Sequence, residues 1–228
     1  MKRLLTLLLL AAAAMFAAGC DKLTNRLADK PAAFNNVDVT GLDYAKGFSL
    51  VDHNGKPRTL QDFRGKLVVL FFGYTQCPDV CPTTMAEMAA VLKELGPAAE
   101  EVQVLFVTLD PERDTQELLA SYVPAFDKRF LGLRGNLEDT ARTAKEFKVF
   151  FSKVPGAEPG SYTMDHTAAS YVFDRQGKVR LFVRHDKGPA ALAHDLRQLL
   201  RWRKYQLPSK AWNKLRAGTT PVSPLSSC

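Results

Sequence analysis

An apolar run that leads into a cysteine-containing turn constrains the fold of this chain most strongly. Residues 67–72 are all apolar, and β-branched and aromatic side chains dominate among them. So short a run is typical of a strand that is buried on both faces of a sheet. Residues 83–95 then carry apolar side chains at the spacing of a helix face, and Pro78 suits a first helical turn. The sequence therefore predicts a strand and a helix joined by a turn over residues 73–82.

That turn contains two of the four cysteines, Cys77 and Cys81. Side chains four residues apart at the start of a helix project from one face, with Cβ atoms about 5–6 Å apart, so that both sulfurs can reach one ion. The helix N-terminus is expected to lower the thiol pKa values. Thiolates select Cu(I), zinc or iron–sulfur chemistry, and a zinc shell would need further ligands. The alternative is a pair of core cysteines or a structural disulfide.

The remaining pattern predicts one α/β domain. The chain has 228 residues, of which 46% are hydrophobic and 24% charged, as in a globular protein with one core. Strands are expected at 48–51 and 58–60 as a hairpin with His53 as a polar turn residue, then at 102–109, 131–133 and 150–154, and at 169–173 and 179–183 as a second hairpin. Helices are expected at 116–126, 137–147 and 189–205, the last with a solvent-facing His194. The sequence therefore predicts a thioredoxin-like fold, with an N-terminal β-hairpin and a central mixed sheet flanked by helices.

The N-terminus has the pattern of an export signal. Lys2 and Arg3 precede an apolar stretch over residues 4–18, which is shorter than the roughly 20 residues that span a bilayer. The sequence that ends at Cys20 resembles the cleavage box of bacterial lipoproteins, except that Ala17 stands where leucine is usual. This resemblance implies a signal peptide over residues 1–19 and a lipid attached to Cys20. Asp21 resembles the signal that retains such proteins in the inner membrane, so we expect a lipid-anchored protein at its periplasmic face.

The expected organisation continues with a tether over residues 20–45, the folded domain over 46–205, and a basic, disordered tail over 206–228. The formal net charge is +7, and no acidic residue follows Asp195, whereas seven basic residues do. Nucleic acid is not expected as a partner of an exported protein. The basic end, Arg197 to Arg216, is either a contact for anionic lipid or an acidic partner, or a solvated helix face. No role is assigned to Cys228.

His166 is the candidate third ligand. It stands where a glycine-rich loop enters a strand, and in a thioredoxin-like layout that loop edge comes near the first strand-to-helix turn. A neutral imidazole there could complete a site of two sulfurs and one nitrogen, with Asp165 or a backbone carbonyl orienting the other ring nitrogen. A lone loop histidine is otherwise an ordinary polar residue.

Three motifs occur in order within residues 45–205. They are Gly73-Tyr74-Thr75 with Cys77-Pro78-Asp79-Val80-Cys81-Pro82, then Asp110-Pro111-Glu112-Arg113-Asp114-Thr115, and Asp165-His166-Thr167 with Tyr171. Together they resemble the Sco/SenC family of copper-binding assembly factors. Gln76 departs from the histidine that many relatives carry before the first cysteine; that histidine is not a ligand in the family pattern.

The resemblance implies one copper ion, Cu(I) or Cu(II), bound by Cys77, Cys81 and His166 and delivered to the CuA centre of cytochrome c oxidase. The expected partners are the CuA-bearing subunit or another copper chaperone. Asp165, Asp79 and Asp110 are candidates for the surrounding shell. The alternative function is a thiol–disulfide oxidoreductase that reduces acceptor cysteines. Three residues between the cysteines, and a histidine that disulfide exchange does not need, favour chelation over that alternative.

Overall fold

The structure is a computed structural model that describes the backbone of residues 34–206 and the side chains up to Arg201. The predicted signal peptide, the first part of the tether, Cys20, Cys228 and the tail beyond Gln206 lie outside the described residues. Within the described part of the chain, no helix combines the length and hydropathy that a membrane crossing requires.

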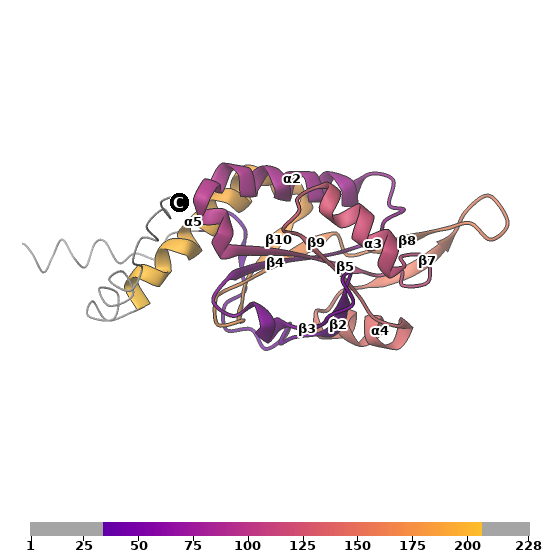
Figure 1. The fold of residues 1–228 in the computed structure, drawn as a ribbon, viewed down its shortest axis with the longest axis horizontal. Helices are drawn as coiled ribbons and strands as arrows, with labels where there is room; N and C mark the ends of the chain where they lie inside the picture. Colours follow the sequence, from indigo (N-terminus) through magenta and orange to yellow (C-terminus); the bar gives the residue numbers. More distant parts are fainter. Residues whose placement is uncertain (1–33, 207–228) are drawn as a thin grey trace, which may run out of the picture. The chain divides into compact units, whose positions relative to one another are not determined.

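An eight-stranded mixed sheet forms the centre of the domain (Figure 1). In spatial order its strands are β1 (Val37–Asp38), β10 (Val179–Arg184), β9 (Ala169–Phe173), β4 (Leu67–Gly73), β5 (Val102–Thr108), β6 (Leu131–Arg134), β2 (Ser49–Asp52) and β3 (Pro57–Thr59). Strands β4, β5 and β6 run parallel, and the other pairs are antiparallel. Every residue of β4 is buried, as its apolar run predicts. Both hairpins predicted from the sequence are confirmed, and β2 with β3 lies at one edge.

The helices cover both faces of this sheet. They are α2 (Val80–Leu95), α3 (Gln116–Tyr122), α4 (Leu137–Glu146) and α5 (Gly188–Gln206), with short 3-10 segments at Leu60–Phe63, Gly96–Glu101, Val123–Ala125 and His185–Lys187. Helices α2 and α5 lie side by side on one face, and α4 lies on the other (Figure 1). Side chains cap the starts of α3 and α4: the Thr115 hydroxyl accepts from the Leu118 N–H, and the Asn136 side chain accepts from the Asp139 N–H. The arrangement confirms the predicted α/β fold class.

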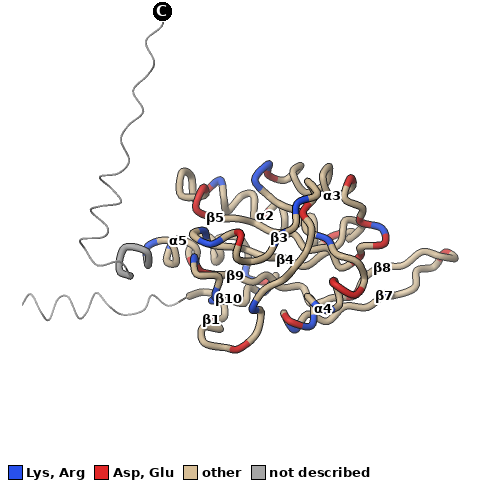
Figure 2. Tube along the Cα trace, turned by 60° about the horizontal axis from the view of Figure 1, so that its bottom comes forward, with Lys and Arg blue, Asp and Glu red and all other residues tan. Residues whose placement is uncertain are grey.

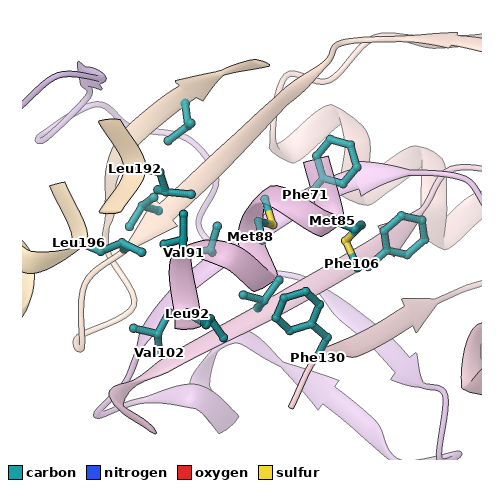
Figure 3. Close-up of a cluster of buried hydrophobic side chains, with 14 of the residues drawn as sticks. Phe71, Met85, Met88, Val91, Leu92, Val102, Phe106, Phe130, Leu192 and Leu196 are labelled. Atoms are coloured by element: carbon teal, nitrogen blue, oxygen red, sulfur yellow. The ribbon is translucent and has the colours of Figure 1, made fainter. Parts of the chain in front are cut away.

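Two hydrophobic cores form because successive residues of β4 point to opposite faces. Leu67, Val69 and Phe71 pack with α2, α3 and α5. Figure 3 shows this core, with Phe71 of β4 and Met85 and Met88 of α2 among its labelled side chains. Val68, Leu70 and Phe72 face the second core, on the α4 side. The first core therefore holds the cysteine-bearing turn against the end of β4.

A separate two-stranded hairpin stands beside the main sheet. It consists of β7 (Phe151–Pro155) and β8 (Tyr162–His166), which pair antiparallel with Phe151 opposite His166. Figure 1 shows it extending beyond the end of the main sheet. The sequence predicts a strand at the position of β7, but it predicts a loop over residues 155–163, with His166 where this loop enters the next strand. In the structure His166 is instead the last residue of a strand, because β8 pairs along its whole length with β7.

The predicted boundary of the tether at residue 45 is wrong. Strand β1 pairs with β10, and Val39 and Ala45 are buried. The Asn36 side chain and N–H donate to Asp195 in α5, at 2.8 and 2.9 Å. Residues 34–45 therefore belong to the folded domain, although their sequence has weak periodicity, because their contacts are with strands and helices more than 100 residues later.

The predicted start of the helix after β4 also needs correction. Helix α2 begins at Val80 with Asp79 as its N-cap, so Pro78 precedes the helix and Pro82 occupies its first turn. His53 lies in the turn of the β2–β3 hairpin, as predicted; it is only 8% exposed there, and its Nδ1 accepts from the Gly132 N–H at 3.0 Å. His194 is half-exposed, as expected, and contacts Asp195.

Candidate metal centre

The two cysteines occupy different environments at the start of α2. Cys81 is fully buried in the first core, whereas Cys77 is half-buried at its edge. Both carry free thiols, and the Cys81 N–H points at the Cys77 sulfur, 3.4 Å away. The Cys77 N–H donates to the Tyr74 carbonyl at 3.3 Å, which keeps the turn tight. One thiol is therefore accessible and the other is enclosed.

The expectation of lowered thiol pKa values is wrong for Cys81. Burial raises the pKa of the Cys81 thiol well above its usual range, and the neighbouring Cys77 adds to the effect. Loss of hydration disfavours the thiolate more than the helix N-terminus favours it. Without a bound cation, Cys81 is consequently a protonated thiol at neutral pH.

His166 lies next to Cys81 although 85 residues separate them in the chain. Its Nε2 is 3.8 Å from the Cys81 sulfur, and its Nδ1 is 3.1 Å from the Thr167 carbonyl oxygen. A carbonyl only accepts hydrogen bonds, so Nδ1 carries the proton and the Nε2 lone pair faces the sulfur. Edge contacts with Phe71 and Tyr74, at ring-centroid distances of 6.5 and 6.1 Å, hold the imidazole in place.

Burial also fixes the charge of this imidazole. Desolvation lowers the pKa of His166, and the opposing effects of the Thr167 carbonyl and Asp165 are smaller. The ring is therefore neutral at neutral pH, which is the form that binds a metal. The sequence leaves open whether a backbone carbonyl or Asp165 orients the second ring nitrogen. In the structure the Thr167 carbonyl contacts it.

An open groove lies beside two of the three candidate ligands, Cys77 and His166. Its lining includes Cys77, His166 and Tyr74, together with the exposed residues Asp79 and Asp165. Cys81 closes the site from the core side. Across the described residues no three His, Cys, Asp or Glu side chains already stand at metal-ligand spacing. A three-ligand site thus needs a side-chain adjustment, and Cys77 is the more exposed of the two cysteines.

The candidate acidic residues fall into two groups. Asp79 and Asp165 are exposed at the groove, and the Asp79 carboxylate accepts weakly from the Thr83 hydroxyl at 3.5 Å. Asp110 is buried. Its carboxylate accepts from the Tyr162 hydroxyl at 2.9 Å and pairs with Arg113, and neither partner is a cysteine or lines the groove. Its role is therefore in the structure around the site.

Sequence reasoning missed the function of Asp114. This fully buried carboxylate accepts from the Thr75 N–H at 3.1 Å and from the hydroxyls of Thr75 and Thr108, both at 2.5 Å. Burial raises its pKa despite these bonds. It ties the turn before Cys77 to the end of β5. The available signal was the place of residues 110–115 at the end of a parallel strand, where binding sites gather.

Comparison with known proteins gives the family. A model of the SCO1/SenC family matches residues 38–201. The mitochondrial protein SCO2 homolog of Bos taurus is 42% identical over 132 residues, which cover 57% of this chain and 50% of that protein. The chain thus spans about half the length of such mitochondrial relatives. A SCO2-like protein of Rickettsia felis is 31% identical over 177 residues, which cover 77% of this chain and 86% of that protein.

Solved structures show the same fold. The structure of Bradyrhizobium japonicum ScoI with copper bound is 39% identical in sequence and superimposes with a TM-score of 0.63, covering 68% of this chain and 99% of that one. The likeness confirms the thioredoxin-like fold. Because the family model spans nearly all of the folded residues, the chain belongs to the SCO1/SenC family.

Proposed function

We propose that this protein is a copper metallochaperone for the assembly of the CuA centre of cytochrome c oxidase. It binds one copper ion through Cys77, Cys81 and His166 and passes the ion to the CuA-bearing subunit, or exchanges it with another copper chaperone. Support comes from its membership of the SCO1/SenC family and from the copper in the related ScoI structure. The copper ion is cargo in this proposal.

One observation carries the assignment: the 3.8 Å approach of the His166 Nε2 to the Cys81 sulfur. Two atoms that bind one copper ion lie at about this separation, and the Nδ1 contact with Thr167 leaves the Nε2 lone pair free for the metal. Two soft sulfurs with one imidazole suit Cu(I), and the nitrogen extends the site to Cu(II). Binding releases the Cys81 proton, so copper affinity should rise with pH.

The unequal exposure of the two thiols gives a direction to copper transfer. The half-buried Cys77 lies at the groove, whereas Cys81 is enclosed. An acceptor thiolate that enters the groove can replace the Cys77 sulfur first, while Cys81 and His166 still hold the ion. Release of Cys81 then takes a proton and restores the neutral thiol that burial favours.

The same asymmetry supports a second candidate, a thiol–disulfide oxidoreductase. An accessible thiol beside a buried one suits attack by Cys77 on an acceptor disulfide, after which Cys81 resolves the mixed disulfide. Overall, two thiols become one disulfide in this protein while the acceptor disulfide becomes two thiols. His166 has no part in that exchange, which separates the two candidates.

The test is His166→Ala, with Cu(I) and Cu(II) titrated in parallel with the rate of reduction of an oxidised acceptor peptide. Copper delivery predicts that the Cu(II)–thiolate absorption is lost and that transfer to the acceptor fails, while the rate of disulfide reduction changes little. His194→Ala, a change of a half-exposed histidine on α5, is the matched control. Unchanged binding of both copper states by the His166→Ala protein would remove His166 from the ligand set, and a parent without copper affinity would favour the oxidoreductase.

We further propose that a diacylglyceryl group on Cys20 anchors the protein at the periplasmic face of the inner membrane. The small residues before Cys20 motivate this proposal. Mass spectrometry of the membrane fraction should find the lipid on an N-terminal Cys20. Any other mature N-terminus, or release of the protein by a salt wash alone, would contradict it.

A further inference from the structure

Arg113 lies where three separate segments meet. Its Nη1 donates to the Gln76 side chain at 3.0 Å and to the Tyr162 carbonyl at 2.9 Å, and its Nε pairs with the buried Asp110. Gln76 precedes Cys77, and Tyr162 begins β8, the strand that ends at His166. One guanidinium therefore joins the cysteine turn to the strand that carries the histidine.

Tyr162 strengthens this junction. The Arg113 guanidinium lies 3.6 Å from the centroid of its ring, a cation–π contact, and the Tyr162 hydroxyl donates to Asp110 at 2.9 Å. On the other strand of the hairpin, Lys153 pairs with Glu112 and lies 4.6 Å from the Tyr162 ring centroid. Residues 110–113 therefore hold both strands of the hairpin.

Side chains attach the hairpin to the domain: Met164 of β8 is buried in the first core, and residues 110–113 hold the end of β8 at Tyr162. Among the described residues, β7 and β8 pair only with each other. Most of their side chains are exposed or half-buried, and a lone two-stranded hairpin is marginally stable in water. His166 lies at the end of β8, so the direction of the strand sets the place of its imidazole. A rotation of β8 about its start would carry the Nε2 away from the Cys81 sulfur.

We propose that Arg113 is the positioning residue of the copper site: with Asp110 and Tyr162, it holds β8 so that His166 reaches the two cysteines. The inference rests on the proposed copper binding and deepens it. An arginine fits this role because its fork donates in several directions at once and its flat face stacks on the tyrosine. Lysine offers neither the fork nor the stacked plane.

The two oxidation states of copper should respond differently to the loss of Arg113. Two thiolates suffice for Cu(I), which accepts low coordination, whereas Cu(II) needs the imidazole nitrogen. A change that misplaces His166 without touching the cysteines must therefore weaken Cu(II) binding more than Cu(I) binding. General destabilisation of the fold would weaken both.

The experiment is a double-mutant cycle with Arg113→Gln and His166→Ala, with both copper affinities measured for each of the four proteins. In the parent background, Arg113→Gln should lower Cu(II) affinity by roughly 10- to 100-fold, as changes around metal ligands do. In the His166→Ala background it should cause no further loss, because the residue through which it acts is absent. Hydrogen exchange of the copper-free protein should show faster exchange in β8, and Arg142→Gln, which removes an exposed arginine of α4, should change neither result.

Equal loss of Cu(II) affinity in the two backgrounds would overturn the inference, as would unchanged exchange in β8. Should the Arg113→Gln protein fail to fold, Tyr162→Phe replaces it in the cycle, since it removes only the hydroxyl bond to Asp110 and keeps the ring beneath Arg113. Tyr162→Phe should then cause a smaller loss of Cu(II) affinity, and only when His166 is present. The same loss of affinity in the His166→Ala background contradicts the proposal. If the parent binds no copper, the proposed function fails, while the exchange measurement still decides whether Arg113 holds the hairpin.

Discussion

Burial sets the chemistry of individual residues near the site. Cys81 lies at the N-terminus of a helix, yet enclosure by the first core raises the pKa of its thiol. The same enclosure lowers the pKa of His166 and keeps the imidazole neutral. Both effects leave uncharged groups, of which the thiol would bind the proposed copper ion after losing a proton and the imidazole directly.

His53 gives a prediction of pH dependence away from the proposed copper site. Burial lowers its pKa against the smaller opposing effect of Asp52. Between the folded-state pKa and the unfolded value of about 6.5, the unfolded chain binds more protons, so the free energy of unfolding falls as the pH decreases through this window. His53→Asn keeps a hydrogen-bond acceptor near the Gly132 N–H and removes the titration, so its stability should depend less on pH.

Urea unfolding of the parent and of His53→Asn between about pH 5 and 8 measures how the stability of each depends on pH. His166 titrates in both, so the difference between them isolates His53. His53→Ala, which leaves the buried Gly132 N–H without its acceptor, should cost about 1–3 kcal/mol near neutral pH. Identical pH slopes for the parent and His53→Asn would count against the account of His53.

Regular elements with a clear period could be predicted from the sequence, and elements defined by distant pairing could not. The buried strand β4, the helix after it and the hairpin of β9 with β10 carry local signals over their whole length. Strand β8 does not, since its identity depends on pairing with β7 across a glycine-rich loop. The three ligand candidates were predicted as a set, through the family motifs. The contacts of Arg113 and Asp114 were not predicted, because the sequence of residues 110–115 does not indicate which distant residues they contact.

Gly73 connects strand β4 to the cysteine turn and permits no side chain. A Cβ there would lie 2.9 Å from ring carbons of Phe71 and Phe106 and 3.0 Å from the Cys81 sulfur. Gly73→Ala should therefore destabilise the fold by about 1–3 kcal/mol and weaken Cu(I) binding, since the sulfur must move. Gly47→Ala is the control, because a Cβ at Gly47 meets nothing within 4 Å. Denaturant unfolding and copper titration of the two variants provide the measurement, and equal stability would contradict the packing argument.

At the scale of the whole domain, charge is dispersed, and buried hydrogen bonds hold the first segment that the structure describes. Figure 2 shows basic and acidic residues interspersed over the described chain. Of the basic end, Arg197 pairs with Glu94 at 2.7 Å, and most of the remainder lies beyond the described side chains. The segment before β2 is held by Asp195 of α5, which is fully buried. This contact fixes the point at which the proposed membrane tether joins the domain.

Asp195→Ala tests that attachment. The carboxylate accepts from the N–H groups of Asn35 and Asn36, both at 2.9 Å, and from the Asn36 side chain. Its loss leaves buried donors unpaired and should cost about 3 kcal/mol of unfolding free energy. Asp186→Ala removes an exposed carboxylate paired with Arg184 and should change stability by less than about 0.5 kcal/mol. If thermal or urea unfolding shows that Asp195→Ala and Asp186→Ala lose comparable stability, Asp195 does not hold the segment.

The central claim is that Cys77, Cys81 and His166 share one copper ion, and X-ray absorption of the Cu(I)-loaded protein tests it most directly. The account predicts a first shell of two sulfurs and one imidazole nitrogen, with one copper per chain. In the His166→Ala protein the imidazole scattering should vanish while both sulfurs remain, since the two thiolates still bind Cu(I). A parent spectrum without an imidazole, or one that His166→Ala leaves unchanged, would contradict the account.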